Sequence, residues 1–135
     1  MSGLLLDTHV YLWHANADPR LPDQFISRIN SNDGPVYLSV VSAWEIAIKV
    51  GLGKLELDMP LQDLIGSAMI LRGIDLLHIA PADIEAYATQ PFPRTNHRDP
   101  FDRMLITQAQ VRDLTILTVD QVFASYKVRY FLPPR

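Results

Sequence analysis

Two short apolar segments, each ending abruptly at an aspartate, limit what this chain can fold into. Segment 4–6 consists of three leucines and stops at Asp7, and the β-branched segment 114–119 stops at Asp120. Uninterrupted apolar runs of this length are typical of strands that are buried on both faces of a parallel sheet. Helical patterns separate the predicted strands, which favours an α/β fold with a mostly parallel sheet between helices.

The rest of the pattern continues the alternation of helices and strands. Further strands are expected at 36–39, 74–79 and 127–132, and helices at 9–14, 22–30, 42–50, 61–71, 81–89, 100–112 and 120–126. A proline-rich loop is expected at 91–98. Trp44, Ile48 and Leu52 form a stripe at helical spacing, which is expected to lie in the core.

Length and composition favour one soluble domain over residues 1–135. The chain has 135 residues, 48% of them apolar, and a net charge of −3, which argues against disorder. No apolar run approaches the roughly 20 residues that span a bilayer, so no contact with a membrane is expected. The first residues lack the basic region of a signal peptide, and the chain has no cysteine, so a cytoplasmic protein without thiolate chemistry is predicted.

The charge is distributed unevenly along the chain. Residues 1–93 carry a net charge of −6, and residues 94–135 carry +3. A basic last third could attract a polyanion. Scattered, solvated charge is the interpretation that this pattern favours on its own.

Four acids lie at positions that structural roles such as helix capping do not explain for all four together. Asp7 and Asp120 follow predicted strands, and functional groups of parallel α/β sheets gather beyond the carboxyl ends of strands. Glu45 and Asp102 lie in strongly apolar helical segments. A carboxylate in such surroundings needs a cation, hydrogen-bond donors or a proton.

Each acid also has a structural explanation. The two strand-end aspartates and Asp99 are suitable N-caps, with Asp102 as an imperfect capping-box partner of Asp99. Ser42 and Glu45 match a capping box, and Glu45 is one helical turn from Lys49. For the acids together these explanations are weaker, because they require several coincidences at one end of one sheet.

If the four acids lie close together in the fold, the ligands they provide favour a hard divalent cation. Carboxylate oxygens bind Mg²⁺ or Mn²⁺, which polarise phosphoryl oxygens and lower the pKa of bound water. Hydroxyls of Thr8, Ser39 and Ser42 could orient waters or carboxylates, or serve as turn and cap groups. A phospho-acceptor receiver domain or an Asp-x-Asp phosphatase would need a second acid near Asp7, and position 9 is a histidine.

The ordered series of motifs resembles the PIN-domain family, and within it the VapC-type toxins of bacterial toxin–antitoxin modules. The resemblance covers about residues 4–128. It is carried by Leu4-Leu5-Leu6-Asp7-Thr8-His9, Ser42-Ala43-Trp44-Glu45-Ile46-Ala47-Ile48-Lys49, Gly53-Lys54-Leu55, His97-Arg98-Asp99-Pro100-Phe101-Asp102-Arg103-Met104-Leu105-Ile106, Gln108-Ala109 and Leu117-Thr118-Val119-Asp120.

The resemblance implies a PIN-like three-layer fold with a parallel sheet of about five strands, and an endoribonuclease that depends on Mg²⁺ or Mn²⁺. Its acidic quartet corresponds to Asp7, Glu45, Asp102 and Asp120, which would hold the ion while metal-activated water attacks an RNA phosphodiester. The remaining residues of the motifs are expected in auxiliary roles (Asp99, Thr8, Ser42 and Arg103) or in contact with substrate phosphate (Arg98, Arg103 and His97), although a plain surface position is favoured for His97.

Kinship also implies a homodimer and a cognate antitoxin that covers the active-site groove. Apolar residues at Tyr11, Trp13, Phe25 and Ile29 could form such an interface or lie in the core. The alternative to a nuclease is a non-catalytic binding module of the same fold whose acids serve only as helix caps. That module predicts no stabilisation by metal, and losses of about 0.5–2 kcal/mol when Asp7 or Asp102 is replaced.

Overall fold

The central feature of the fold is a five-stranded parallel sheet with the strand order β3-β2-β1-β4-β5. The computed structural model describes residues 3–133, except for the side chains of 67–69. Every pair of neighbouring strands is parallel, and Leu5 of the central strand aligns with Tyr37 on one side and Ile116 on the other. The strands are β1 (Leu4–Leu6), β2 (Val36–Ser39), β3 (Ile74–Leu77), β4 (Thr115–Leu117) and β5 (Arg129–Phe131).

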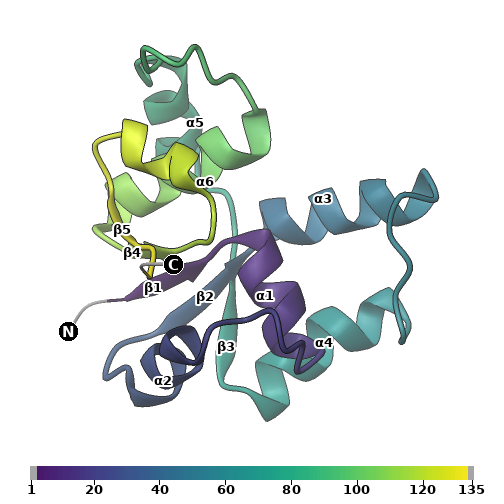
Figure 1. The fold of residues 1–135 in the computed structure, drawn as a ribbon. Helices are drawn as coiled ribbons and strands as arrows, with labels where there is room; N and C mark the ends of the chain where they lie inside the picture. The colour runs from purple at the N-terminus through teal and green to yellow at the C-terminus, as the bar shows by residue number, and fades with distance from the viewer. Residues whose placement is uncertain (1–2, 134–135) are drawn as a thin grey trace.

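Helices cover both faces of this sheet (Figure 1). They are α1 (Thr8–Ala15), α2 (Asp23–Ser31), α3 (Val40–Gly51), α4 (Leu61–Leu71), α5 (Pro81–Ala88) and α6 (Pro100–Arg112), followed by the 3₁₀ helix η1 (Gln121–Ser125). Helices α1, α2 and α4 lie on one side of the sheet, and α5 and α6 lie on the other. The predicted α/β class with a PIN-like layered sheet is therefore confirmed. In the described part of the chain, no helix has the length and apolarity needed to cross a membrane.

The alternation of side chains along β1 creates two separate cores. Leu4 and Leu6 face α1, α2 and α4 and pack with Phe25 and Leu64. Leu5 points to the opposite face and packs in the cluster formed mainly by α6, β4 and η1. All three leucines are fully buried, because helices cover both faces of β1. A strand buried on both faces needs apolar residues at every position, which accounts for the uninterrupted run.

The beginning of α3 differs from the prediction. The helix starts at Val40, and its N-cap is Ser39, whose hydroxyl accepts a hydrogen bond from the backbone N–H of Val41 at 3.1 Å. Ser42 is fully buried inside the helix, so the predicted capping box between Ser42 and Glu45 is wrong. Because the buried strand passes directly into the helix, Ser39 is the only polar residue at the boundary, and the apolar pattern predicts a later start.

The stripe expected in the core is also wrong. Trp44 is 61% exposed and Leu52 is 64% exposed, because α3 turns Val41 and Ile46 toward the sheet. By contrast, Tyr11, Phe25 and Ile29 lie in the core and are not free for an interface. The other boundaries shift by a few residues, and the predicted helix at 120–126 is a 3₁₀ helix.

A buried hydroxyl links α1 to α4. Tyr11 is fully buried, and its hydroxyl donates to the backbone carbonyl of Leu64. Burial raises the pKa of this phenol to about 12.

We expect Tyr11→Phe to lower the free energy of unfolding by about 1–2 kcal/mol, because the carbonyl of Leu64 loses its donor. Chemical denaturation measures this loss, and Tyr130→Phe on the exposed edge strand should change stability by less than about 0.5 kcal/mol. Equal effects of the two variants would contradict the prediction.

Candidate active site

The order of the strands places a topological switch point between β1 and β4. The chain builds β1, β2 and β3 outward in one direction, then crosses over to place β4 on the other side of β1. At such a switch point the connections leave the carboxyl ends of two neighbouring strands in opposite directions, and ligands of α/β proteins bind there. Asp7 directly follows β1, and Asp120 follows β4 after Thr118 and Val119.

A threonine joins the two strand ends. The hydroxyl of Thr118 donates to Asp7 Oδ2 at 2.8 Å, and its oxygen accepts the backbone N–H of Asp120 at 2.9 Å. Asp120 in turn caps η1 by accepting the N–H of Val122 at 3.0 Å. Asp7 occupies the N-cap position of α1 without a side-chain cap bond, so its carboxylate is not used to cap the helix.

Glu45 reaches the same region from α3. The hydroxyl of Thr8 donates to Glu45 Oε1 at 2.8 Å and lies 2.9 Å from the buried hydroxyl of Ser42. The other carboxylate oxygen of Glu45 pairs with Lys49 at 3.3 Å, as the spacing of the two residues predicts. Thr8 therefore bonds directly to Glu45, whereas Ser42 contacts only the hydroxyl of Thr8.

The first turn of α6 carries the remaining acids. Asp99 caps this helix by accepting the backbone N–H groups of Phe101 at 2.8 Å and Asp102 at 3.1 Å, as predicted. The ring of Phe101 packs edge-on against Trp44 of α3, with 5.3 Å between the centroids. This contact brings the helix that carries Asp102 against the helix that carries Glu45.

The acids influence one another electrostatically. Burial, followed by the negative charges of four other acids, together raise the pKa of the Asp102 carboxyl to about 8; in order of effect these acids are Asp99, Asp7, Glu45 and Asp120. Burial also raises the pKa of Asp7, although the hydrogen bond from Thr118 lowers it in part. Contacts also connect the segments that carry these acids: Thr118 bonds to Asp7 and to the N–H of Asp120, and Thr8, next to Asp7, bonds to Glu45. Phe101, next to Asp102, packs against Trp44, next to Glu45.

The donor chemistry of this region fits a hard divalent cation. Carboxylate and hydroxyl oxygens are the ligands that Mg²⁺ and Mn²⁺ prefer. Within the described residues, no three His, Asp or Glu side chains lie close enough together to hold an ion as they stand. Like charges in one region repel one another, and a bound cation would offset this repulsion. The residues fit the ion in kind, and their carboxylates would have to move closer to bind it.

Of the three residues expected to contact substrate, two are less exposed than predicted. Arg103 is 2% exposed and donates to the backbone carbonyls of Gln90 and Pro91, so it holds no carboxylate and faces no substrate. His97 has a side chain only 15% exposed, and its Nε2 lies 3.2 Å from Asp102 Oδ2, so the favoured surface position is wrong. Arg98 remains exposed, with its guanidinium 4.4 Å from the ring centroid of Phe92.

Three of the seven basic residues in the last third of the chain are buried or paired within the fold. Arg103 is buried, Arg112 pairs with Asp83, and Arg129 pairs with Asp113. Arg135 lies outside the described residues. The charge of these three arginines is therefore satisfied inside the protein.

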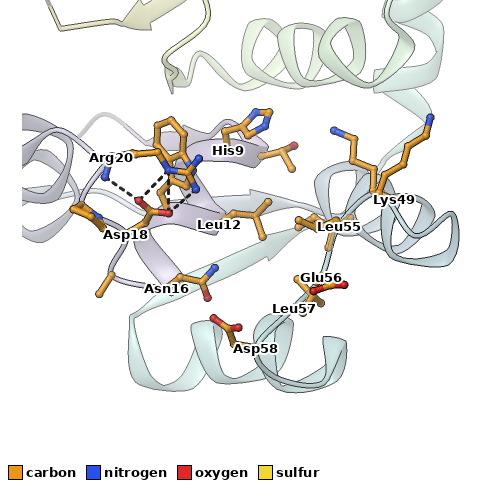
Figure 2. A pocket seen from close by; sticks show the side chains of 16 residues that line it. His9, Leu12, Asn16, Asp18, Arg20, Lys49, Leu55, Glu56, Leu57 and Asp58 are labelled. Atoms are coloured by element: carbon orange, nitrogen blue, oxygen red, sulfur yellow. Dashed lines mark hydrogen bonds and ion pairs between the residues drawn. The ribbon is translucent and has the colours of Figure 1, made fainter.

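A groove of about 590 Å³ opens beside the acids and shares Thr8 and Lys49 with them. Figure 2 shows Leu12 and Leu55 between the two sides of the groove, with His9 and Lys49 on one side and Glu56 and Asp58 toward the other. The ion pair between Asp18 and Arg20 closes one end. The groove combines an apolar floor with charged rims of both signs.

Two residues of the site were missed by sequence reasoning. Thr118 holds Asp7, and its position two residues before Asp120 at the end of a predicted strand was a usable signal. Tyr126 contacts both His97 and Arg103, at separations of 29 and 23 residues along the chain. No local pattern predicts contacts of that range.

The protein is an α/β domain with acidic side chains beyond the carboxyl ends of β1 and β4 in a parallel sheet. The sequence model of the PIN domain family matches residues 4–128, so the chain belongs to the PIN domain family. No curated protein sequence matches the chain.

Solved structures of toxin–antitoxin proteins share this fold. VapBC2 from Rickettsia felis, bound to a DNA fragment from its promoter, is 13% identical with a TM-score of 0.68, and covers 98% of this chain and 99% of that one. FitAcB from Neisseria gonorrhoeae is 22% identical with a TM-score of 0.67, and covers 95% and 96%. VapC20 from Mycobacterium tuberculosis, a toxin that cleaves the sarcin–ricin loop, is 12% identical with a TM-score of 0.64, and covers 96% and 99%.

Proposed function

We propose that this protein is a divalent-metal-dependent endoribonuclease and the toxin of a toxin–antitoxin module. The observation that carries the proposal is the gathering of Asp7, Glu45, Asp102 and Asp120 around the β1–β4 switch point, where their charges contribute to raising the pKa of Asp102 to about 8. A site that holds this much negative charge in partial burial is suited to a cation. Membership of the PIN domain family and the fold shared with VapC toxins support the same activity.

The four acids would hold Mg²⁺ or Mn²⁺ in this proposal. When bound, the ion would supply an activated water and neutralise charge on the phosphodiester. Thr118 orients Asp7 through its hydroxyl, and Thr8 orients Glu45, so two of the acids are already fixed by neighbours. Asp99 keeps the first turn of α6 in place and thereby positions Asp102.

The partners follow from the same proposal. The substrate is RNA, and exposed Arg98, one residue before Asp99, would contact its phosphates. The protein acts in the cytoplasm. A cognate antitoxin is expected because a solved structure from Klebsiella pneumoniae that shares the fold is a toxin–antitoxin complex. A homodimer is expected from kinship, and sedimentation equilibrium would measure it. Exposed apolar side chains such as Trp44, Leu52 and Leu71 provide surface for such contacts.

RNA cleavage tests the activity directly. Purified protein should cleave a structured RNA pool with Mg²⁺ or Mn²⁺ and fail to do so with chelator. Asp7→Asn should abolish cleavage, because this substitution removes a carboxylate next to the switch point while keeping its shape. Asp75→Asn changes the same charge on the exposed part of β3 and should cleave like the wild type. Equal cleavage by both variants would show that a contaminant or another site is responsible.

The non-catalytic binding module remains the second candidate, because Asp99 and Asp120 do cap helices. Asp7, Glu45 and Asp102 accept no cap bond in the described structure, which favours the nuclease. Thermal unfolding separates the two functions. Mn²⁺ should raise the melting temperature of a nuclease, since an ion that binds only the folded state stabilises it. A module whose acids are only caps should not respond.

A further inference from the structure

A buried arginine without an acidic partner among the described residues follows Asp102 in α6. Arg103 is 2% exposed, and among the described residues it forms no ion pair. Its guanidinium donates to the carbonyls of Gln90 at 2.8 Å and Pro91 at 3.2 Å, and lies 3.9 Å from the ring centroid of Phe92. A buried charge is costly unless its donors are satisfied. Its position next to Asp102 in the sequence suggests a role in the site.

The third contact of the guanidinium begins a chain of hydrogen bonds that ends at the site. Arg103 donates to the hydroxyl oxygen of Tyr126 at 3.1 Å. The same hydroxyl lies 2.8 Å from His97 Nδ1, and His97 Nε2 lies 3.2 Å from Asp102 Oδ2. Tyr126 is buried, and the rings of Tyr126 and His97 pack edge to face with 5.7 Å between centroids. The four side chains therefore form one connected path.

The chemistry of the groups gives this path a direction. A guanidinium can only donate, so the Tyr126 oxygen must act as the acceptor in that contact. The hydroxyl hydrogen of Tyr126 is then available to His97 Nδ1 at 2.8 Å or to the His97 carbonyl at 3.4 Å, and the shorter contact is the better hydrogen bond. A histidine that accepts at Nδ1 carries its proton on Nε2 when it is neutral. That proton faces the Asp102 carboxylate.

We propose that Arg103, Tyr126 and His97 form a directed hydrogen-bond chain in which His97, as its Nε2–H tautomer, is the positioning residue for the Asp102 carboxylate. The inference rests on the proposed function, because it assigns a role to a group that holds Asp102 for the ion. His97 Nε2 contacts Asp102 Oδ2, whereas Oδ1 accepts no hydrogen bond from the described part of the chain and is available to bind the ion. Carboxylates that bind metals are commonly held in this way by a further hydrogen bond.

The tautomer of His97 is the first test. Nitrogen-15 NMR of the imidazole in metal-free protein at pH 9, above the ordinary pKa of histidine, distinguishes the two tautomers. At this pH the Asp102 carboxyl is also above its pKa of about 8, so it is mainly an acceptor. We expect the Nε2–H form in the wild type and a loss of that preference in Tyr126→Phe. The exposed His9 should give the same signals in both proteins. An Nδ1–H form in the wild type would overturn the proposal.

Metal affinity is the second test, with two substitutions of the same residue. His97→Gln keeps an amide N–H near the position of Nε2, whereas His97→Leu keeps bulk without a donor. Titration calorimetry with Mn²⁺ should show weaker binding by about 10–100-fold for His97→Leu, the usual effect of removing a group that orients a ligand. His97→Gln should recover most of this affinity. Equal losses in the two variants would mean that the histidine only fills space, which overturns the positioning role.

Failure of the nuclease itself would look different. If the wild type binds no Mn²⁺ and cleaves no RNA, the proposed function fails, and the tautomer experiment still decides the direction of the chain because it needs neither metal nor RNA. Thermal unfolding in chelator checks that each variant is folded. If His97→Leu does not fold, Tyr126→Phe carries the affinity test, since it removes only one hydroxyl and should weaken Mn²⁺ binding if the chain matters.

Discussion

Asp102→Asn is expected to make the metal-free protein more stable at pH 8 while abolishing RNA cleavage. The substitution removes the acid whose pKa is raised to about 8 by burial and by the charges of four other carboxylates. The amide has nearly the same shape and no charge, so the repulsion inside the cluster falls. A residue whose removal stabilises the fold but eliminates activity is typical of a functional site that is strained for its task.

The sign of the pH dependence follows from the direction of the shift. Asp102 has a higher pKa in the folded protein than the ordinary value of 3.8, so the folded state holds its proton more tightly than the unfolded state. The stability that this group contributes is fully present below about pH 4 and is lost as the pH rises toward 8, by at most about 1.4 kcal/mol per pH unit. The advantage of Asp102→Asn over the wild type should therefore grow between pH 5 and pH 8.

Chemical denaturation at several pH values, with chelator present, measures this advantage. Asp75→Asn, on the exposed part of β3, removes the same charge and should show no such growth. Adding Mn²⁺ should reverse the order, because the wild type gains binding energy that the variant lacks. A wild type that is more stable than Asp102→Asn at pH 8 in chelator would contradict the clustering of acids described above.

Asp83→Ala should be the most destabilising substitution of an acid in this protein, at about 3–5 kcal/mol. Asp83 is fully buried between α5 and α6, and it accepts two hydrogen bonds from Arg112 at 2.5 and 2.9 Å and one from the Ala80 N–H at 2.7 Å. Removing the carboxylate leaves a partly buried guanidinium and a backbone N–H without their acceptor. Glu85→Ala, on the exposed side of the same helix, should change stability by less than about 0.5 kcal/mol.

The acid sensitivity of this ion pair has the opposite sign to that of Asp102. Burial alone would raise the pKa of Asp83, but the hydrogen bonds from Arg112 and Ala80 outweigh it and leave the pKa below 3.8. Its contribution is therefore present at neutral pH and is lost only as the pH falls below about 4. Denaturation of the wild type and of Asp83→Ala at pH 7 and pH 3 should show a smaller difference at pH 3. A difference that does not shrink would show that packing, and not charge, dominates the loss.

The alternation of helices and strands was predictable because each buried strand is a short apolar run with a polar or proline-rich boundary. This held for segments 4–6 and 36–39 and for the helix at 61–71. It failed where the boundary itself is apolar. Residues 39–41 pass from β2 into α3 without a break in hydrophobicity, and only Ser39 marks the change. The exposure of Trp44 could not be predicted either, because the direction in which a helix faces the sheet is decided by packing.

The sequence predicts which acids belong to the candidate site, but it does not predict the hydrogen bonds that connect them to other residues. Parallel sheets place strand ends at one edge, which is sufficient to expect Asp7 and Asp120 near each other. Asp102 and Glu45 were singled out because a carboxylate among apolar neighbours needs an explanation. The roles of His97, Arg103 and Tyr126 depend on contacts between distant segments, and the spacing of residues along the chain carries no information about them.

The place of β1 in the sheet has a consequence for the synthesis of the protein. The strand that carries Asp7 precedes β2 and β3 in the chain, but its other neighbour, β4, follows both of them. A nascent chain that has not yet exposed β4 therefore lacks one partner of its central strand as well as Asp120. The acids can assemble only after residues 115–120 have left the ribosome, although Asp7 and Glu45 emerge much earlier.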